Sequence, residues 1–244
     1  YGIKTGLNEA FVIDSATKDK LCAQDSRSAE LLKPFLEGKD IRRWRAEPRG
    51  LWGIMLTKGW TKGRYGPGNE EEQWKRLSSE FPGIAGWLSQ FSSKAARRTD
   101  KGDYWWELRS CDYLALYDEP KVIFAHFQSE PLFFFDDEHF YTNNRGYIWR
   151  AGLFEVALLN SKVVWFFMTG VTSSIQGGFF EATTQNTTRI PIPATTEAQK
   201  EALAALAAEC QRVAKKRRDI EAALRRRIPD LCPPGRDPKL TTRL

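Results

Sequence analysis

The sequence has few of the residues that build metal centres and disulfide frameworks. Its 244 residues include two histidines, and its four cysteines form no C-x-x-C pair. Neither a structural zinc site nor a dense disulfide framework is therefore predicted. His126 and His139 each lie in an apolar, aromatic stretch, where a hydrogen-bonded sheet histidine is the commoner role. We expect a reduced, cytoplasmic chain without a metal site. The cysteines are Cys22, Cys111, Cys210 and Cys232.

The sequence also lacks a secretory signal pattern and any apolar run long enough to cross a bilayer. The longest candidate is interrupted at Asn160, Ser161 and Lys162. No membrane partner is expected. Disorder is not expected either, because 41% apolar and 13% aromatic residues can fill a core. Lys and Arg number 37 against 31 Asp and Glu, a net charge of +6 that favours a polyanionic partner without identifying one.

Motifs for phosphate binding and nucleophilic catalysis are absent as well. No G-x-S-x-G elbow occurs. Gly2 and Gly6 are spaced like a phosphate-binding loop, but Leu7 and Asn8 lead from them into an expected strand, whereas such loops open a helix. We interpret the two glycines as allowing tight backbone geometry before a first strand.

One nuclease-like trace stays as an alternative. Glu119 and Lys121 flank a proline just before an expected strand, with Asp112 and Asp118 upstream. Carboxylates with a lysine could hold Mg²⁺ and steady an attacking water. A surface turn that leads into a strand is the favoured interpretation, because such short matches are frequent. A Mg²⁺-dependent nuclease is the less favoured one.

Periodicity and turn residues predict an α+β fold, with a mainly antiparallel, mixed sheet and flanking helices. A capping box of Asn69 and Glu72 marks one helix start. Strands are expected at about residues 9–14, 40–45, 51–56, 104–108, 121–127, 131–135, 140–149 and 190–193. Helices are expected at about 28–36, 70–79, 84–97 and 153–168. A glycine-rich basic loop is expected at 58–68.

The strongest helix signal lies near the C-terminus. Thr196 and Gln199 form a capping box, and the helix should continue to about Ile228, before Pro229. Its apolar residues recur at alternating spacings of three and four, which predicts a coiled-coil-like seam that also allows self-association. Arg217 occupies one seam position and suggests an acidic partner across it. The other seam residues are Leu203, Leu206, Cys210, Val213, Ile220 and Leu224.

Basic residues interleaved with aromatics cluster beside the expected turns. Long cations on loops can reach phosphates while the scaffold stays rigid, so these clusters point to nucleic-acid binding as strongly as to a merely solvated surface. The candidate DNA-binding residues are Arg42, Arg43, Lys58, Trp60, Lys62, Arg64, Arg97, Arg98 and Lys101.

Six stretches, in chain order, resemble one known family. They run from about Gly2 to Pro193 and resemble the TaqI-like C-terminal specificity domain. This is the target-recognition domain of adenine-specific DNA methyltransferases and of restriction enzymes that fuse nuclease, methylase and recognition parts. The stretches are GIKTGLNEAFVID, LLKPFLEGKDIRRW, RRTDKGDYWWELRSCDY, EPKVIF, LLNSKVVWFF and GGFFEATTQNTTRIPIP.

The resemblance implies a domain, at 1–194, that reads double-stranded DNA while a methyltransferase domain of the same polypeptide flips an adenine from the duplex. The family's Asn-Pro-Pro-aromatic tetrapeptide and its glycine-rich S-adenosylmethionine loop are both missing from this sequence. No catalytic residue and no cofactor are therefore expected in this chain. S-adenosylmethionine is expected for the separate catalytic domain, and the start at Tyr1 suggests a cut between the two.

Base contacts are expected from loops that lie between the family-like stretches. These are the region from Trp60 to Lys101 and the turn that carries Asn143, Asn144 and Arg145. Asn and Arg side chains at loop tips can make bidentate hydrogen bonds with base edges. Residues 195–229 are expected to form a packing helix, and residues 230–244, rich in Pro and Arg, a flexible tail.

Overall fold

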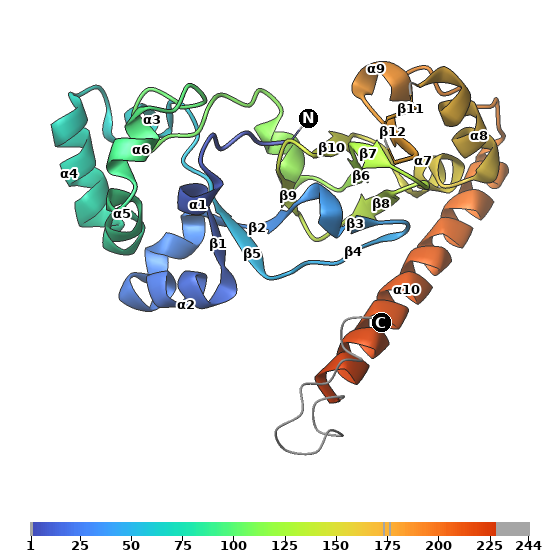
Figure 1. Ribbon diagram of the computed structural model, residues 1–244, viewed down its shortest axis with the longest axis horizontal. Helices are drawn as coiled ribbons and strands as arrows, with labels where there is room; N and C mark the ends of the chain where they lie inside the picture. The colour runs from blue at the N-terminus through green and yellow to red at the C-terminus, as the bar shows by residue number, and fades with distance from the viewer. Residues whose placement is uncertain (1, 173, 176, 228–244) are drawn as a thin grey trace.

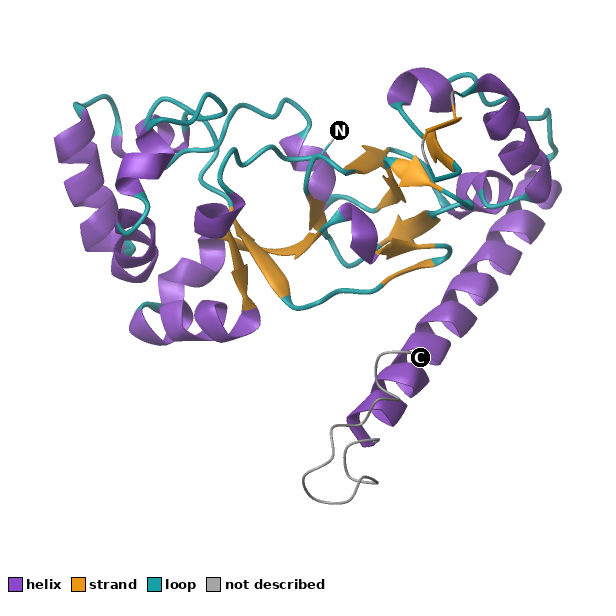
Figure 2. Ribbon diagram, viewed as in Figure 1, coloured by secondary structure: helices purple, strands orange, loops and turns teal. Residues whose placement is uncertain are grey.

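The computed structural model describes residues 2–172, 174–175 and 177–227. Figure 1 shows an elongated molecule with helices α1 to α6 at one end, sheets in the middle, helices α7 to α9 at the other end and a long helix running away from the body. Figure 2 shows the same arrangement by element type. The helices are α1 (Asn8–Phe11), α2 (Ser15–Gln24), η1 (Ser26–Leu31), η2 (Gly38–Asp40), α3 (Trp60–Tyr65), α4 (Glu70–Glu80), α5 (Pro82–Ser89), α6 (Ser92–Ala96), η3 (Leu114–Asp118), α7 (Leu153–Leu159), α8 (Lys162–Val171), α9 (Thr184–Thr187) and α10 (Glu197–Arg227).

The strands form small sheets that are antiparallel with one exception, as predicted. The sheets have the orders β1-β5-β2-β9, β10-β6-β8, β11-β12-β7 and β3-β4. The exception is the parallel pair of β2 and β9, which joins the first sheet to the turn that leads into β10. The strands are β1 (Val12–Asp14), β2 (Leu32–Leu36), β3 (Ile41–Arg42), β4 (Arg45–Ala46), β5 (Leu51–Ile54), β6 (Lys121–Ala125), β7 (Phe127–Gln128), β8 (Phe133–Asp136), β9 (Tyr141–Thr142), β10 (Gly146–Trp149), β11 (Ser174–Ile175) and β12 (Phe179–Glu181).

Strand β6 lies at the centre of the second half of the molecule. All five of its residues are buried because both of its faces are covered. Successive side chains of a strand point to opposite faces. Val122 and Phe124 accordingly pack with α7 residues, whereas Ile123 and Ala125 pack in a different cluster with Ile41 of β3.

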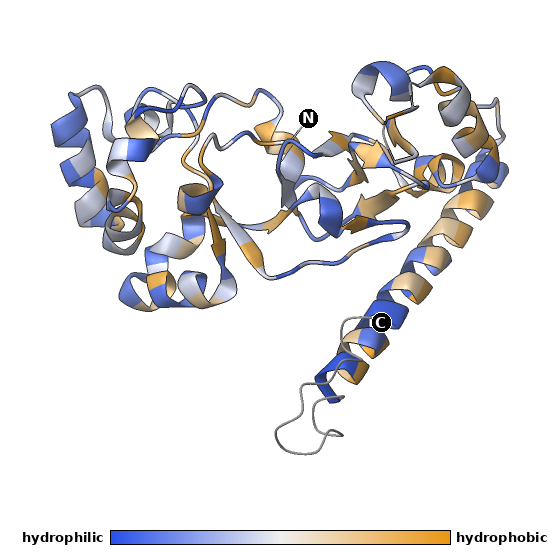
Figure 3. Cartoon of the chain, viewed as in Figure 1, coloured by the Kyte–Doolittle hydropathy of each residue, from blue (hydrophilic) through white to orange (hydrophobic). Residues whose placement is uncertain are grey.

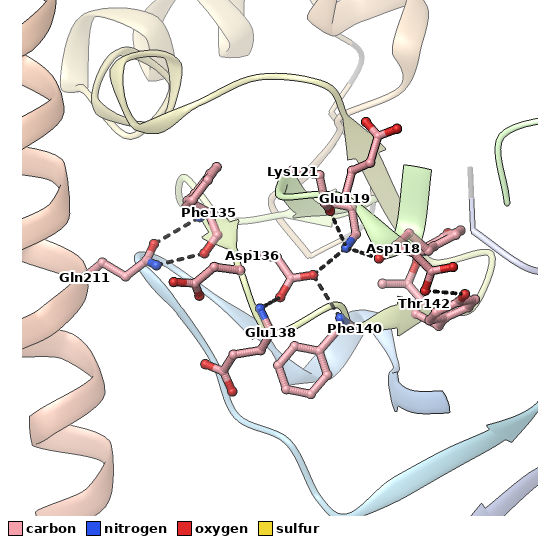
Figure 4. A network of polar contacts seen from close by, with 12 residues as sticks. Asp118, Glu119, Lys121, Phe135, Asp136, Glu138, Phe140, Thr142 and Gln211 are labelled. Atoms are coloured by element: carbon pink, nitrogen blue, oxygen red, sulfur yellow. Dashed lines mark hydrogen bonds and ion pairs between the residues drawn. The ribbon is translucent and has the colours of Figure 1, made fainter. Parts of the chain in front are cut away.

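A buried polar network ties β6 to β8 and to the long helix (Figure 4). Lys121 Nζ lies 2.7 Å from Asp136 Oδ2, and neither side chain is exposed. The ammonium also donates to the Tyr117 carbonyl, and Asp136 accepts from the Phe140 amide. Burial raises the pKa of Asp136, while Lys121 opposes this shift. At the outer edge of β8, the Gln211 side chain of α10 bonds to both the N–H and the C=O of Phe135.

Helix α10 begins as predicted. The Thr196 and Gln199 side chains each accept the other residue's backbone N–H. The helix packs against α7 and β4 through a face that contains the buried Ala207 and Gln211. The predicted seam is on a different face: Leu206 and Ile220 are 62% and 59% exposed. The helix is therefore confirmed, but its seam is exposed except for the partly buried Leu203.

Several local predictions were wrong because tertiary contacts decided them. The expected helix at 28–36 is instead η1 followed by β2, and α2 at 15–24 was not predicted. The strand expected at 9–14 begins with the single turn α1. Residues 104–108 form turns that bury Trp106 and Glu107, and 190–193 form no strand.

Three further predictions had the wrong boundaries. The expected loop at 58–68 contains α3, because the Glu107 carboxylate accepts the Gly59 and Thr61 amides at its start. The helices expected at 84–97 and 153–168 are each divided, into α5 and α6 and into α7 and α8. In the second case Ser161 caps a new helix by accepting the Val164 amide.

Part of the expected C-terminal organisation lies outside the described residues, namely Ile228, Pro229 and the tail at 230–244. Among the helices that the structure describes, no single one is both long and apolar enough to cross a bilayer. Helices α7 and α8 meet that criterion only as a pair, bent by 64° at the break between them.

Candidate nucleic-acid interface

The turn from β9 to β10 brings distant parts of the chain together around one cavity. This cavity, here called the basic hollow, has a volume of about 280 Å³. Three of its side chains are cations: two arginines and a lysine from the N-terminal segment. A histidine adds a further positive charge when it is protonated. The lining residues are Lys4, Arg109, His126, Asn144, Arg145 and Tyr147.

The turn is held rigidly by backbone contacts. Asn143 is buried; its N–H donates to the Leu36 carbonyl and its side chain accepts the Arg145 N–H at 3.0 Å. The N-terminal segment lies alongside, with Gly2 N–H donating to the Gly146 carbonyl at 2.8 Å. A Cβ on Gly2 would lie 1.9 Å from the Asn143 carbonyl oxygen, so only glycine fits there. The family-like opening stretch thus supports the turn.

Asn144 and Arg145 are exposed at the tip of this turn. The Arg145 guanidinium lies 5.1 Å from the centroid of the Phe127 ring. It makes no hydrogen bond or ion pair with any residue that the structure describes. A cation over an aromatic face is oriented while its N–H donors stay available. Arg145 is therefore a preoriented donor group facing solvent.

Lys4 and Arg109 share a single carboxylate across the hollow. Asp100 lies 3.3 Å from Lys4 Nζ and 3.4 Å from Arg109 Nη1. Both cations are about half exposed. Because one carboxylate cannot neutralise two cations and leaves Arg145 unpaired, the wall of the hollow carries excess positive charge. Phosphates are attracted to such a wall.

His126 forms the inner wall of the basic hollow between two aromatic rings. Its ring stacks on Phe127 at 4.1 Å and lies 5.3 Å from Tyr147. Burial lowers the pKa of His126, and Arg145 lowers it further, whereas Glu181 opposes the shift from 3.8 Å. The imidazole is therefore neutral at pH 7.

A second cavity of about 550 Å³ lies on the other side of Arg145. Lys39 and Arg42 line it, together with the aromatic rings of Phe127 and Phe179. Arg145 is the wall that the two cavities share. Glu37 and Glu130 line this second cavity too, and Glu37 lies 3.1 Å from Lys39 Nζ, so the cavity carries charges of both signs.

The other candidates from the hairpin are partly engaged within the chain. Arg42 Nε lies 3.0 Å from Glu47, and Arg43 donates to the Asn160 carbonyl at 2.7 Å. Arg43 also lies over the Trp44 ring. These contacts hold the hairpin against the break between α7 and α8, so Arg43 has a structural role.

The candidates on α3, and Lys58 just before it, lie in the helical end of the molecule. Lys62 and Lys58 pair with Asp103 at 2.7 and 3.9 Å, and this contact raises the pKa of Lys62. Arg64 Nε donates to Glu80 at 3.0 Å. Trp60 is half-buried and packs edge-on against Tyr65 and Phe81. None of these residues lines the basic hollow.

The three candidates that precede Gly102 differ from one another. Arg97 is exposed, and its side chain makes no hydrogen bond or ion pair with the residues that the structure describes, whereas Lys101 donates to the Ala96 carbonyl. Arg98 is 7% exposed. Its guanidinium donates to five backbone carbonyls, and burial lowers its pKa to about 10. The prediction that Arg98 contacts DNA was wrong, because its donors are all used inside the protein. The five carbonyls belong to Thr5, Ala95, Asp100, Trp105 and Glu107.

Sequence reasoning missed Lys4, Arg109, His126 and Tyr147 as parts of this site. Lys4 lies in a stretch that was interpreted only as a lead into a strand, and Arg109 directly follows core residues. Their only local signal is charge. What unites them is the long-range pairing of the N-terminal segment with the turn, which no short stretch of sequence encodes.

The residues of the nuclease alternative are not arranged to hold Mg²⁺ and an attacking water. Lys121 is fully buried and its ammonium contacts Tyr117, Glu119 and Asp136. The Lys121 ammonium therefore cannot orient an attacking water molecule at the protein surface. Glu119 pairs instead with Arg150 at 3.0 Å. No group of three or more His, Cys, Asp or Glu side chains suited to a metal ion occurs within the part of the chain that the structure describes.

Comparison with known families identifies the family of this chain. The family model of the TaqI-like C-terminal specificity domain matches residues 33–192, and the chain belongs to this family. The match includes Arg145, Arg109 and the hairpin, and it begins after Lys4.

A solved structure of similar fold is that of the type IIL restriction-modification enzyme MmeI in complex with DNA. The TM-score is 0.52 at 14% sequence identity, over 85% of this chain and 26% of the other. The likeness shows the fold, and this chain spans about a quarter of the length of the MmeI chain. No curated protein matches this chain.

Proposed function

We propose that this chain is a sequence-specific DNA-recognition domain that reads duplex DNA with the basic hollow. The observation that carries the proposal is the pair Asn144 and Arg145, exposed on a rigid turn and surrounded by cations. Membership of the specificity-domain family supports it. Lys4, Arg109 and Lys39 neutralise phosphates and fix the register. Arg145 and Asn144 contact base edges.

The two proposed readers favour particular bases. Arg145 presents an unpaired guanidinium fork, the geometry that bonds in a bidentate manner to guanine O6 and N7. Asn144 has the donor and acceptor pair that matches adenine N7 and N6. Each good bidentate pair discriminates by roughly 1–3 kcal/mol. A recognition site with adjacent guanine and adenine is therefore favoured.

We further propose that the parent polypeptide is an adenine-N6 DNA methyltransferase of a restriction-modification or phage-defence system. In this proposal the chain positions a separate methyltransferase domain, which binds S-adenosylmethionine and carries out the methyl transfer. The resemblance of the six sequence stretches supports it. No step of that chemistry is assigned to a residue of this chain. The proposed compartment is the cytoplasm, where such an enzyme meets DNA.

Fluorescence anisotropy with labelled duplexes tests the binding proposal. Affinity should fall steeply with added salt, because phosphate contacts release counterions. Arg145→Ala should weaken binding to a selected site. Arg212→Ala is the matched control, because Arg212 is an exposed arginine on α10 that pairs with Glu209 away from the hollow. Equal titrations for both variants, or binding that ignores salt, would contradict the proposal.

A further inference from the structure

Helix α10 carries an apolar stripe that no described part of the chain covers. The stripe repeats every three or four residues and follows one face of the helix, and Figure 3 shows hydrophobic residues recurring along α10. Its four large apolar members are at least half exposed. We call these residues, with Cys210 and Arg217 between them, the α10 stripe. The large members are Leu206, Val213, Ile220 and Leu224.

The stripe is separate from the face by which α10 is anchored. Ala207 and Gln211 are buried against the body, and Lys215 pairs with Glu138 at 2.8 Å. On the stripe side, Cys210 and Val213 border an open hollow of about 570 Å³ next to the β3–β4 hairpin. The body thus fixes the rotation of α10 and leaves the stripe exposed, with Cys210, Val213 and Arg217 facing this open hollow. A row of apolar residues that are at least half exposed is typical of an interaction surface.

The charge of α10 changes sign along its length. Residues 197–211 contain three glutamates and one lysine, whereas residues 212–227 contain eight lysines and arginines and two acidic residues. A helix with this distribution is complementary to itself only in the antiparallel direction. Parallel pairing would bring the two basic halves together and place one Arg217 against the other.

We propose that the partner of the α10 stripe is the same stripe of a second copy, docked antiparallel. With the two-fold axis near Lys215, Leu206 faces Leu224 of the second copy and Cys210 faces Ile220. Val213 then lies beside Arg217, whose charge is already paired with Glu221 at 2.6 Å and whose aliphatic stem can cover apolar surface. Glu209, which borders the stripe, lies within about one turn of Arg217 of the second copy.

The first test is the mass of the full chain in solution, measured by light scattering over a concentration series. The unmodified chain should form a dimer. Leu206→Glu should weaken dimerisation by about tenfold or more, because it places a carboxylate in the apolar layer. Ala205→Glu is the matched control: it adds the same charge at the neighbouring exposed position, about 100° around the helix. A monomeric unmodified chain, or equal masses for the two variants, would overturn the proposal.

The second test distinguishes the antiparallel arrangement from the parallel one. In the antiparallel register, Cys210 of the two copies are about 15 Å apart along the axis, from ten residues at 1.5 Å each. A disulfide needs Cα atoms within about 7 Å. Mild oxidation of Ile220→Cys, followed by peptide mapping, should give a disulfide between positions 210 and 220 of different copies. A disulfide that joins Cys210 of one copy to Cys210 of the other, in this variant or in the unmodified chain, would overturn the antiparallel arrangement.

Discussion

The Arg145 guanidinium lies over the Phe127 ring with its centre 5.1 Å from the ring centroid, and no described carboxylate pairs with it. Most other candidate cations of this chain are paired or buried. Lys62, for example, pairs with Asp103, and the buried Arg98 donates to five backbone carbonyls. Arg145 is thus held by an aromatic contact that orients its charge without using its donors. This is the arrangement that a base-reading arginine needs.

Substitutions of Arg145 should separate charge from bidentate bonding. Arg145→Lys keeps the cation but loses the planar fork. We expect its affinity for random duplex DNA to stay close to that of the unmodified chain. Its preference for the selected site should fall by roughly 1–3 kcal/mol, or about 5- to 150-fold. Competition binding with selected and scrambled duplexes measures this. Equal losses on both duplexes would show that Arg145 contacts only phosphate.

Lys4 and Arg109 should contribute affinity without specificity. Because each is proposed to contact a phosphate, Lys4→Ala should weaken binding uniformly across sequences and reduce the salt slope by about one. Lys200→Ala is a suitable control, since Lys200 is an exposed lysine of α10 that pairs with Glu197. The logarithm of affinity is plotted against the logarithm of salt concentration. An unchanged slope for Lys4→Ala would place Lys4 outside the interface.

The depressed pKa of His126 predicts how stability changes with pH. The unfolded chain protonates this histidine near its ordinary value of about 6.5, whereas the folded chain does so only at lower pH. Stability is therefore fully present above about pH 6.5 and is lost as the pH falls from there to the folded value, by up to about 1.4 kcal/mol per pH unit. His126→Gln should lose less stability over this range in urea unfolding. If the free energy of unfolding changed equally with pH in both proteins, the pKa of His126 would not be depressed in the folded chain.

The buried pair of Lys121 and Asp136 should be sensitive to the loss of one partner. Asp136→Asn leaves the Lys121 ammonium buried without a counterion, and we expect a loss of about 3–5 kcal/mol in the free energy of unfolding. The double variant Lys121→Met with Asp136→Leu removes both charges and should recover much of the loss. Urea unfolding of the two variants measures the difference. A double variant as unstable as Asp136→Asn would show that the pair itself contributes the stability.

Arg98 should behave as a structural residue. Arg98→Met keeps much of the stem but leaves five carbonyls without their donor, so it should lower the free energy of unfolding by several times the roughly 1 kcal/mol of one hydrogen bond. Arg97→Met is the neighbouring control, because the Arg97 side chain is exposed and makes no hydrogen bond or ion pair with described residues. Thermal unfolding compares the two. Similar stabilities for both variants would contradict the structural role.

The elements that sequence reasoning found are those with local signals. Asn69 caps α4 by accepting the Glu72 amide three residues away, and α10 starts with the reciprocal bonds of Thr196 and Gln199. Strands such as β6 were found because apolar, β-branched and aromatic residues cluster in them. These signals span only a few residues, so the chain need not be folded for them to be recognised.

The elements that were missed depend on distant residues. Helix α3 starts where the Glu107 carboxylate accepts hydrogen bonds from backbone amides that lie 46 and 48 residues earlier in the chain. Similarly, β2 became a strand because it lies between β5 and β9. The candidate site divides in the same way. The sequence pointed to the turn with the exposed Asn144 and Arg145, but Asn143, also expected to contact bases, is buried and supports the turn instead. Lys4, Arg109 and His126 join the turn only through long-range packing.

The most direct test of the account is selection from a pool of randomised duplexes, carried out in parallel with the unmodified chain and Arg145→Ala. We predict that the unmodified chain enriches a defined site containing guanine, and that Arg145→Ala loses the preference for that guanine while other positions of the site persist. Enrichment of the same site by both proteins would contradict base reading by Arg145, and no enrichment by the unmodified chain would contradict sequence-specific recognition by this domain.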